Sequence, residues 1–199
     1  RLNLRDTYDL GAEFYRWEFA TAVAGAVLGT HPFDQPNVQS AKDMTERALR
    51  QFEASGELSN MEDSAPIEIL LEQASAGDYL VIMAYIPQSL EVDTALDALR
   101  RRVTERYGIA TTMGYGPRFL HSTGQLHKGG PGTGLFLQIT TKHVRDLDIP
   151  GTPFTFSVLA DAQALGDLQA LRASGRRSVR VDACANLAQG IHKMADELA

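Results

Sequence analysis

Residues 79–86 read Tyr-Leu-Val-Ile-Met-Ala-Tyr-Ile, between Gly77-Asp78 and Pro87. A short, unbroken apolar run bounded by turn-forming residues is typical of a β-strand that is buried on both faces. Strands of this kind occur in parallel sheets, because helices cover both sides of such sheets. The stretch therefore indicates an α/β fold.

Helical and strand patterns alternate after this run. Residues 93–107 carry apolar side chains at 95, 96, 99 and 103 and arginines on the opposite face, which is the helical period. Further apolar strands are predicted at 109–113, 135–140 and 178–182, and further helices at 156–172 and 185–198. We predict a three-layer α/β fold in which helices flank a mainly parallel sheet of about four strands.

An N-terminal helical segment precedes the sheet. Apolar residues recur every three or four positions over 10–28, and the Ala and Gly residues of this segment suit a helix packed tightly into a core. Residues 37–55 give a second helical pattern. Pro36 stands near its start and Gly56 just after its end, as expected of helix termini.

A polar stretch divides these helices from the sheet. Residues 56–66 are rich in Ser, Glu and Asp, which is typical of a linker. We therefore expect a helical segment over 1–56 and an α/β domain over 67–199. The sequence opens without an initiator methionine, so we also expect it to be part of a longer chain.

Composition excludes several classes of protein. With 199 residues, 44% of them hydrophobic, the chain can bury a sizeable core. A formal net charge of −6 disfavours a nucleic-acid partner, which would require an excess of Lys and Arg on one face. A single cysteine, Cys184, excludes a disulfide framework. The sequence contains neither a long apolar run nor a signal-peptide pattern, so we expect a cytoplasmic protein without a membrane partner.

The segment 114–130 is the densest in residues that bind ligands. It holds one arginine, two histidines, one lysine, two hydroxyl residues and five glycines within seventeen positions, and it follows a predicted strand. Ligands of open α/β sheets bind where strands end at their carboxyl termini. The candidate binding residues are Arg118, His121, Ser122, Thr123, His127 and Lys128.

Two interpretations of this segment stay open. It can bind a phosphate or a sugar through its cations and backbone N–H groups, or it can be a glycine-rich turn whose polar side chains brace the backbone. No metal or other cofactor is expected, because His121 and His127 are six residues apart and lack neighbouring carboxylates. A nucleotide-binding loop is also disfavoured, since 129–134 lacks a trailing Gly-Lys-Ser/Thr.

Residues 14–18 through Gly29, followed by His-Pro-Phe-Asp-Gln-Pro-Asn-Val-Gln-Ser-Ala-Lys at 31–42, resemble the C-terminal signature of glucose-6-phosphate isomerases. That signature runs Phe-Asp-Gln-x-Gly-Val-Glu-x-x-Lys. The matching positions are Phe33, Asp34, Gln35, Val38 and Lys42, and the departures are Asn37 and Gln39. The segment 114–131 resembles the tail of bifunctional transaldolase/glucose-6-phosphate isomerase proteins.

The resemblance implies an aldose-ketose isomerase that interconverts glucose 6-phosphate and fructose 6-phosphate. In this family a lysine and a histidine open the sugar ring, and a glutamate carries the proton between C2 and C1. By the match, Lys42 takes the catalytic ring-opening role and Gln35 binds the substrate. The family's glutamate and histidine precede the signature and are not found in this sequence. The implied partners are a phosphorylated sugar, the upstream isomerase segment and, in the bifunctional proteins, a transaldolase domain. The chain alone is expected to be inactive.

Other classes of function remain. The α/β domain can be a non-catalytic assembly or phosphosugar-binding module of such a fusion, or an unrelated phosphosugar-binding regulator. A transaldolase barrel does not fit, because 199 residues do not hold an eightfold strand-helix alternation. A substitution of Lys42 distinguishes these classes, since only an isomerase depends on its amine.

Overall fold

The computed structural model describes residues 3–34, 36–58, 64–184 and 186–198. The chain divides into two compact units, Arg1–Gln35 and Pro36–Ala199. The boundary lies before the second predicted helix rather than after it, because that helix packs on the α/β unit. Residues 59–63 of the predicted linker lie outside the described residues.

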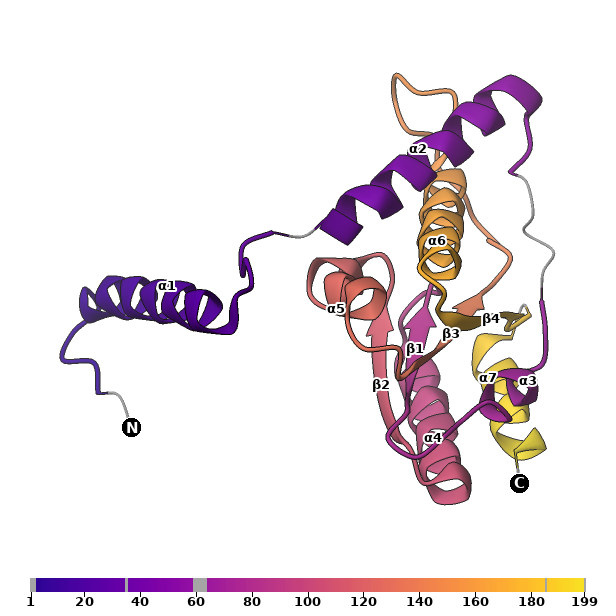
Figure 1. The fold of residues 1–199 in the computed structure, drawn as a ribbon. Helices are drawn as coiled ribbons and strands as arrows, with labels where there is room; N and C mark the ends of the chain where they lie inside the picture. The colour runs from indigo at the N-terminus through magenta and orange to yellow at the C-terminus, as the bar shows by residue number, and fades with distance from the viewer. Residues whose placement is uncertain (1–2, 35, 59–63, 185, 199) are drawn as a thin grey trace. The chain divides into compact units, whose positions relative to one another are not determined.

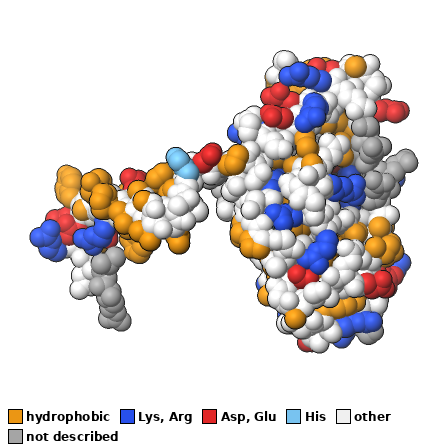
Figure 2. Space-filling model, viewed as in Figure 1, with side chains coloured by type: hydrophobic (Ala, Val, Ile, Leu, Met, Phe, Trp, Pro, Cys, Tyr) orange, Lys and Arg blue, Asp and Glu red, His pale blue; other side chains and the backbone are white. Residues whose placement is uncertain are grey.

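The first unit contains a long helix, α1 (Asp9–Leu28), which ends at Gly29 in a left-handed conformation with φ of 68°. The helix is confirmed, but the expectation that it packs into a core is wrong, because Gly25 is the one buried residue along it. Its apolar side chains surround the helix axis instead of forming one stripe, and most are exposed (Figure 2). Among the described helices, none has the combination of length and apolar character needed to cross a bilayer.

The second unit is built on a four-stranded, entirely parallel sheet, as predicted (Figure 1). The strands are β1 (Tyr79–Ala84), β2 (Ala110–Tyr115), β3 (Gly134–Thr140) and β4 (Arg177–Asp182), in the order β2-β1-β3-β4. In β1, Val81 pairs in register with Thr112 of β2 and Phe136 of β3. The two central strands are therefore β1 and β3, which explains why their runs of apolar residues are almost unbroken.

Side chains of β1 alternate between two cores. Leu80, Ile82 and Ala84 belong to the larger core, which also contains residues of α3 (Ile67–Leu71), α4 (Leu90–Tyr107) and α7 (Leu187–Glu197). Val81 and Met83 belong to the core on the other face, with residues of α6 (Phe156–Ala173). The three predicted layers are therefore confirmed.

A further helix, α2 (Pro36–Ser55), packs on α6. Ala48 of α2 is buried against Ala162 and Leu165 of α6. Gly166 allows the close approach, because a Cβ at this position would lie 2.5 Å from the Oγ1 atom of Thr45. The packing fixes α2, and with it Lys42, on the α/β unit.

The predicted loop over 114–130 contains short helices instead. A 3-10 turn, η1 (Arg118–His121), is followed by α5 (Gly124–Gly129), and both lie between β2 and β3 in the chain. Two glycines place η1 against the sheet. A Cβ at Gly114 would lie 2.6 Å from the Cβ of Phe119, and one at Gly116 would lie 2.5 Å from the ring of Tyr85.

Candidate functional site

The predicted substrate ligand Gln35 lies outside the described residues. Phe33 and Asp34 of the signature belong to the first unit, whereas Val38 and Lys42 belong to the second. The signature is thus divided between the two compact units.

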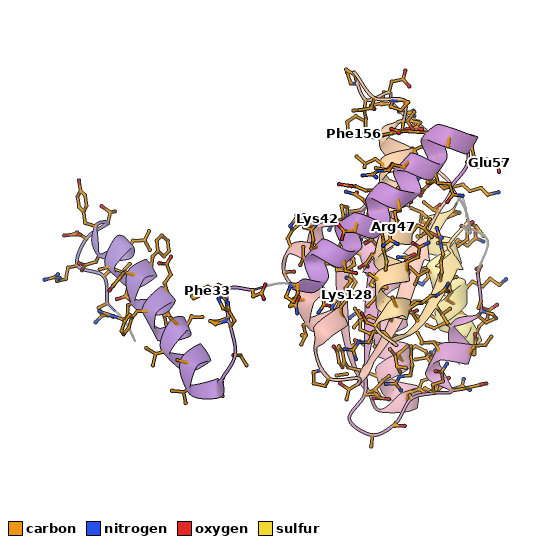
Figure 3. The ribbon with its side chains drawn as sticks, turned by 45° about the horizontal axis from the view of Figure 1, so that its top comes forward. Phe33, Lys42, Arg47, Glu57, Lys128 and Phe156 are labelled. Atoms are coloured by element: carbon orange, nitrogen blue, oxygen red, sulfur yellow. The ribbon has the colours of Figure 1, made fainter. Side chains whose placement is uncertain are left out.

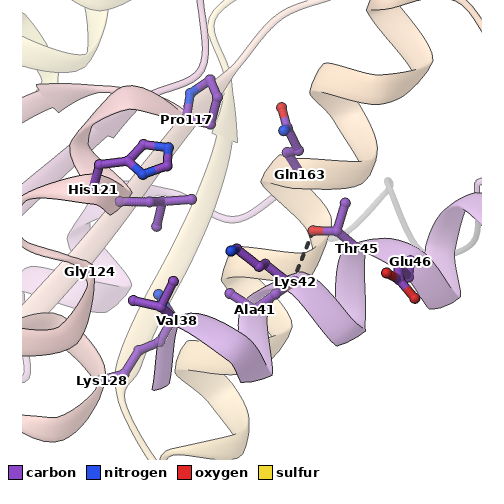
Figure 4. Close-up of a pocket in the computed structure, with 11 residues that line it drawn as sticks. Val38, Ala41, Lys42, Thr45, Glu46, Pro117, His121, Gly124, Lys128 and Gln163 are labelled. Carbon is purple, nitrogen blue, oxygen red and sulfur yellow. Dashed lines mark hydrogen bonds between the residues drawn. The ribbon is translucent and has the colours of Figure 1, made fainter. Parts of the chain in front are cut away.

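Lys42 lines a cavity of about 310 Å³ between α2, η1, α5 and α6. Apolar walls come from residues such as Val38, Ala41 and Leu120. The polar residues that line this cavity, here named the Lys42 cavity, are Lys42, Thr45, Glu46, His121, Lys128 and Gln163. Two predicted site residues from the 114–130 segment, His121 and Lys128, therefore share one cavity with Lys42 (Figure 4). Figure 3 shows Lys42 on α2.

Lys42 and His121 are exposed, and neither makes an ion pair with a described residue. Figure 4 shows Lys42, His121 and Gln163 directed toward the same open space. Glu46 is the carboxylate among the lining residues, and it points away from that space toward the exposed side of α2. It is 3.1 Å from the guanidinium of Arg50, so it is already paired.

Lys128 has a partner of its own. The residue is only 4% exposed, and its Nζ atom lies 2.5 Å from Oδ1 of Asp167 on α6, which is 1% exposed. Tyr85 donates its hydroxyl hydrogen to the other oxygen of Asp167 at 3.3 Å. Burial raises the pKa of Asp167, and the Lys128 ammonium opposes that rise. The ammonium of Lys128 is thus engaged in joining α5 to α6.

Arg176 braces the same region from the start of β4. Its guanidinium donates to the carbonyl oxygens of Lys128 and Gly130, each at 2.6 Å. These are carbonyls at the C-terminal end of α5, which lack partners within the helix. A cation at a helix C-terminus is favourable, so Arg176 holds the short α5 in place.

A second cavity, of about 670 Å³, lies on the other side of η1, near β1 and β2. It is here named the Arg118 cavity, and its polar lining includes Gln88, Thr112, Tyr115, Arg118, His121, Ser122, Thr123 and His127. His121 lines both cavities. Five of the predicted binding residues therefore meet in this second cavity.

Arg118 is exposed and makes no ion pair with a described residue. The hydroxyls of Ser122 and Thr123 both donate to the carbonyl oxygen of Phe119, at 3.0 and 3.3 Å. Their oxygen atoms can still accept hydrogen bonds from a ligand. These two side chains brace the backbone, as one of the two open interpretations expected, and they also border the cavity.

His127 is buried among aromatic rings. It is 4% exposed, and its ring centroid lies 5.7 Å from that of Phe119 and 5.3 Å from that of Phe136. Burial lowers the pKa of His127 to about 4, and the positive charge of Lys128 adds to the effect. The ring is thus neutral near pH 7. Its Nδ1 atom has no hydrogen-bond partner among the described residues.

Sequence reasoning missed Asp167, Tyr85, Thr45 and Gln163. One signal for Asp167 exists, because it is a lone carboxylate on the apolar face of the helix 156–172, where an acid requires a buried partner. Thr45 and Gln163 carry no such signal. Each is an ordinary polar residue at a helix position, and only the packing of α2 on α6 brings them to the cavity.

The chain matches no protein-family model and no curated protein sequence. Its fold is similar to the crystal structure of hypothetical protein TT0462 from Thermus thermophilus, with a TM-score of 0.54 and 18% sequence identity. The similarity covers 83% of this chain and 44% of that one, so this chain spans less than half of the length of that protein. At this identity, the likeness shows a common fold.

Proposed function

We propose that this chain is the C-terminal part of a glucose-6-phosphate isomerase, and that the Lys42 cavity holds its part of the active site. One observation carries the proposal. Lys42, matched by the signature, and His121, from a different segment of the chain, line the same cavity. The resemblance implies a lysine and a histidine for ring opening and places the family's histidine upstream of the signature, so the ring-opening role of His121 is an assignment of this proposal and not part of the resemblance.

The chemistry of ring opening suits these two side chains. A base takes the proton from the C1 hydroxyl of the cyclic sugar while an acid protonates the ring oxygen, and the C1–O5 bond breaks. Imidazole is the side chain that most often transfers a proton in such a step, and His121 supplies one here. The ammonium of Lys42 can donate a hydrogen bond to the oxygen on which negative charge develops.

The subsequent proton transfer between C2 and C1 needs a carboxylate base. Glu46 does not suit this role, because it is exposed, paired with Arg50 and directed away from Lys42. The base is therefore assigned to the upstream isomerase segment, as the resemblance implies. In this proposal the second unit supplies ring opening and substrate contacts, and the upstream segment supplies the base.

The experiment substitutes Lys42 by Ala in the full natural chain and measures turnover of fructose 6-phosphate with a coupled assay. Loss of the ammonium is expected to lower kcat at least about 100-fold, because an oxyanion loses its positioned donor. Lys193→Ala is the matched control, since this lysine is exposed on α7 and its ion pair is with the neighbouring Glu197. Normal turnover by Lys42→Ala would overturn the proposal.

A second candidate function is a non-catalytic assembly module. One observation favours it, because α1 exposes large apolar side chains, among them Phe14, Trp17 and Phe19. Exposed apolar surface of this kind is typical of protein interfaces. The Lys42 experiment also separates this candidate from the first, since an assembly role does not depend on the amine.

A further inference from the structure

The Arg118 cavity is distinguished by its charge. Arg118 and His121 line it, and no carboxylate is among its described lining residues. Arg118 makes no hydrogen bond or ion pair with a described residue, so its guanidinium is available. A guanidinium binds the oxygens of a phosphate or carboxylate through two parallel hydrogen bonds.

A third cavity, at the carboxyl ends of β3 and β4, provides the contrast. It contains cations too, but Asp161 and Asp182 also line it, and Asp161 lies 3.0 Å from the ring of His143. Carboxylates in that position oppose a second anion. No described carboxylate lines the Arg118 cavity to repel an anion, so this cavity is the better site for a negatively charged group.

Two further polar side chains that line the Arg118 cavity, Gln88 and Tyr115, are uncharged. Tyr115 donates its hydroxyl hydrogen to Asp93 at 2.6 Å, and the side-chain amide of Gln88 donates to the same carboxylate at 3.1 Å. Asp93 accepts both hydrogen bonds but does not itself line the cavity. An anion is therefore favoured beside Arg118, and uncharged hydroxyl groups are favoured near Gln88 and Tyr115.

His127 lies at the wall of this cavity. The ring lines this cavity, is neutral near pH 7, and has a buried Nδ1 atom without a hydrogen-bond partner among the described residues. A buried polar atom without a partner is unfavourable, because it has lost its hydrogen bonds to water. The Nδ1 atom has almost no accessible surface, so the ring borders the cavity through its other atoms and can report on a ligand that binds there.

We propose that the Arg118 cavity binds a small phosphorylated polyol, with the phosphate at Arg118 and the hydroxyl groups toward His127 and Gln88. The volume of about 670 Å³ suits a ligand of this size. This site is separate from the Lys42 cavity and shares only His121 with it. The binding proposal is independent of the isomerase proposal, because binding in the Arg118 cavity requires neither Lys42 nor a catalytic step.

The test follows the imidazole signals of His127 by ¹⁵N NMR in the 199-residue chain. Fructose 6-phosphate is titrated first, and inorganic phosphate and fructose are then titrated separately. Fructose 6-phosphate is expected to shift the His127 signals saturably and to bind at least about tenfold more tightly than fructose, since the charged hydrogen bonds come from the phosphate. Inorganic phosphate is expected to compete with it.

Three variants locate the site. Arg118→Gln is expected to weaken binding at least about tenfold, because it removes the charged donor from an exposed position without breaking a described contact. Lys42→Gln is expected to leave the His127 response unchanged. Arg145→Gln, an exposed arginine in the loop after β3, is the matched control and is expected to bind normally.

Three results would overturn the proposal: His127 signals that do not respond at saturating ligand, binding that survives Arg118→Gln, or a response that Lys42→Gln abolishes. The last two would assign the ligand to another site. The isomerase proposal can fail in its own assay while this one holds, because turnover and the His127 signals are measured independently.

Discussion

Lys128 connects α5 to α6 through a buried ion pair with Asp167. The polar, glycine-rich surroundings mark it as a candidate binding residue, and it does line the Lys42 cavity. Its ammonium, however, is paired with Asp167, which is 39 residues further along the chain. Whether a lysine faces a ligand or a buried carboxylate depends on the packing of two helices, which no local pattern specifies.

His127 makes the stability of the second unit depend on pH. Its pKa is lowered from 6.5 to about 4 in the folded chain, so between these values the unfolded chain binds a proton that the folded chain does not. Stability is therefore fully present above pH 6.5 and is lost as the pH falls toward 4. The expected loss is up to about 3 kcal/mol, measured by urea unfolding at a series of pH values.

The control for this prediction is His127→Phe, which keeps an aromatic ring beside Phe119 and Phe136 but cannot be protonated. The difference in unfolding free energy between about pH 6.5 and about pH 4.5 is expected to be smaller in this variant than in the natural chain. An equal difference in both proteins would show that other groups cause the acid sensitivity.

At the scale of elements, the contact between α2 and α6 determines where Lys42 lies. Gly166→Ala places a methyl group 2.5 Å from Thr45 Oγ1 and 2.7 Å from the Thr45 backbone nitrogen, so α2 must move. We expect a loss of about 1–3 kcal/mol in the unfolding free energy, as for other overpacked sites. Thermal and urea unfolding measure this loss.

Gly124→Ala is the comparison for this variant, because a Cβ there would meet Leu120 at 3.5 Å, an ordinary contact. It is expected to change the unfolding free energy by less than about 1 kcal/mol, in line with the helix preferences of Gly and Ala. A similar effect of both variants would mean that α2 and α6 are not in close contact in solution.

The longer elements follow directly from the sequence pattern. All four described strands and the described helices of eleven or more residues are predicted, because each carries enough residues to show a pattern. The short helices α3, η1 and α5 are missed, since four to six residues cannot show a helical period. The burial of α1 is also mispredicted, because a helix with apolar residues on all sides does not indicate which element packs against it.

At the scale of the whole molecule, the proposed active site is incomplete within this chain. The described residues that line the Lys42 cavity include no carboxylate suited to act as the base. We therefore expect the purified 199-residue chain to show no isomerase turnover in a coupled assay, even at high protein concentration. Under the isomerase proposal, a longer chain that includes the proposed upstream segment is expected to show turnover. Activity of the 199-residue chain near ordinary enzyme rates would contradict this.

His121 stands at the common wall of the two cavities. An anion that accepts a hydrogen bond from the ring on the Arg118 side would fix the orientation of the imidazole, and that orientation would change how the ring contacts a sugar on the Lys42 side. Thermodynamic linkage makes such an influence reciprocal, so each occupant would alter the affinity for the other by the same factor. A single histidine that lines both cavities is thus enough to couple ligand binding in one cavity to ligand binding in the other.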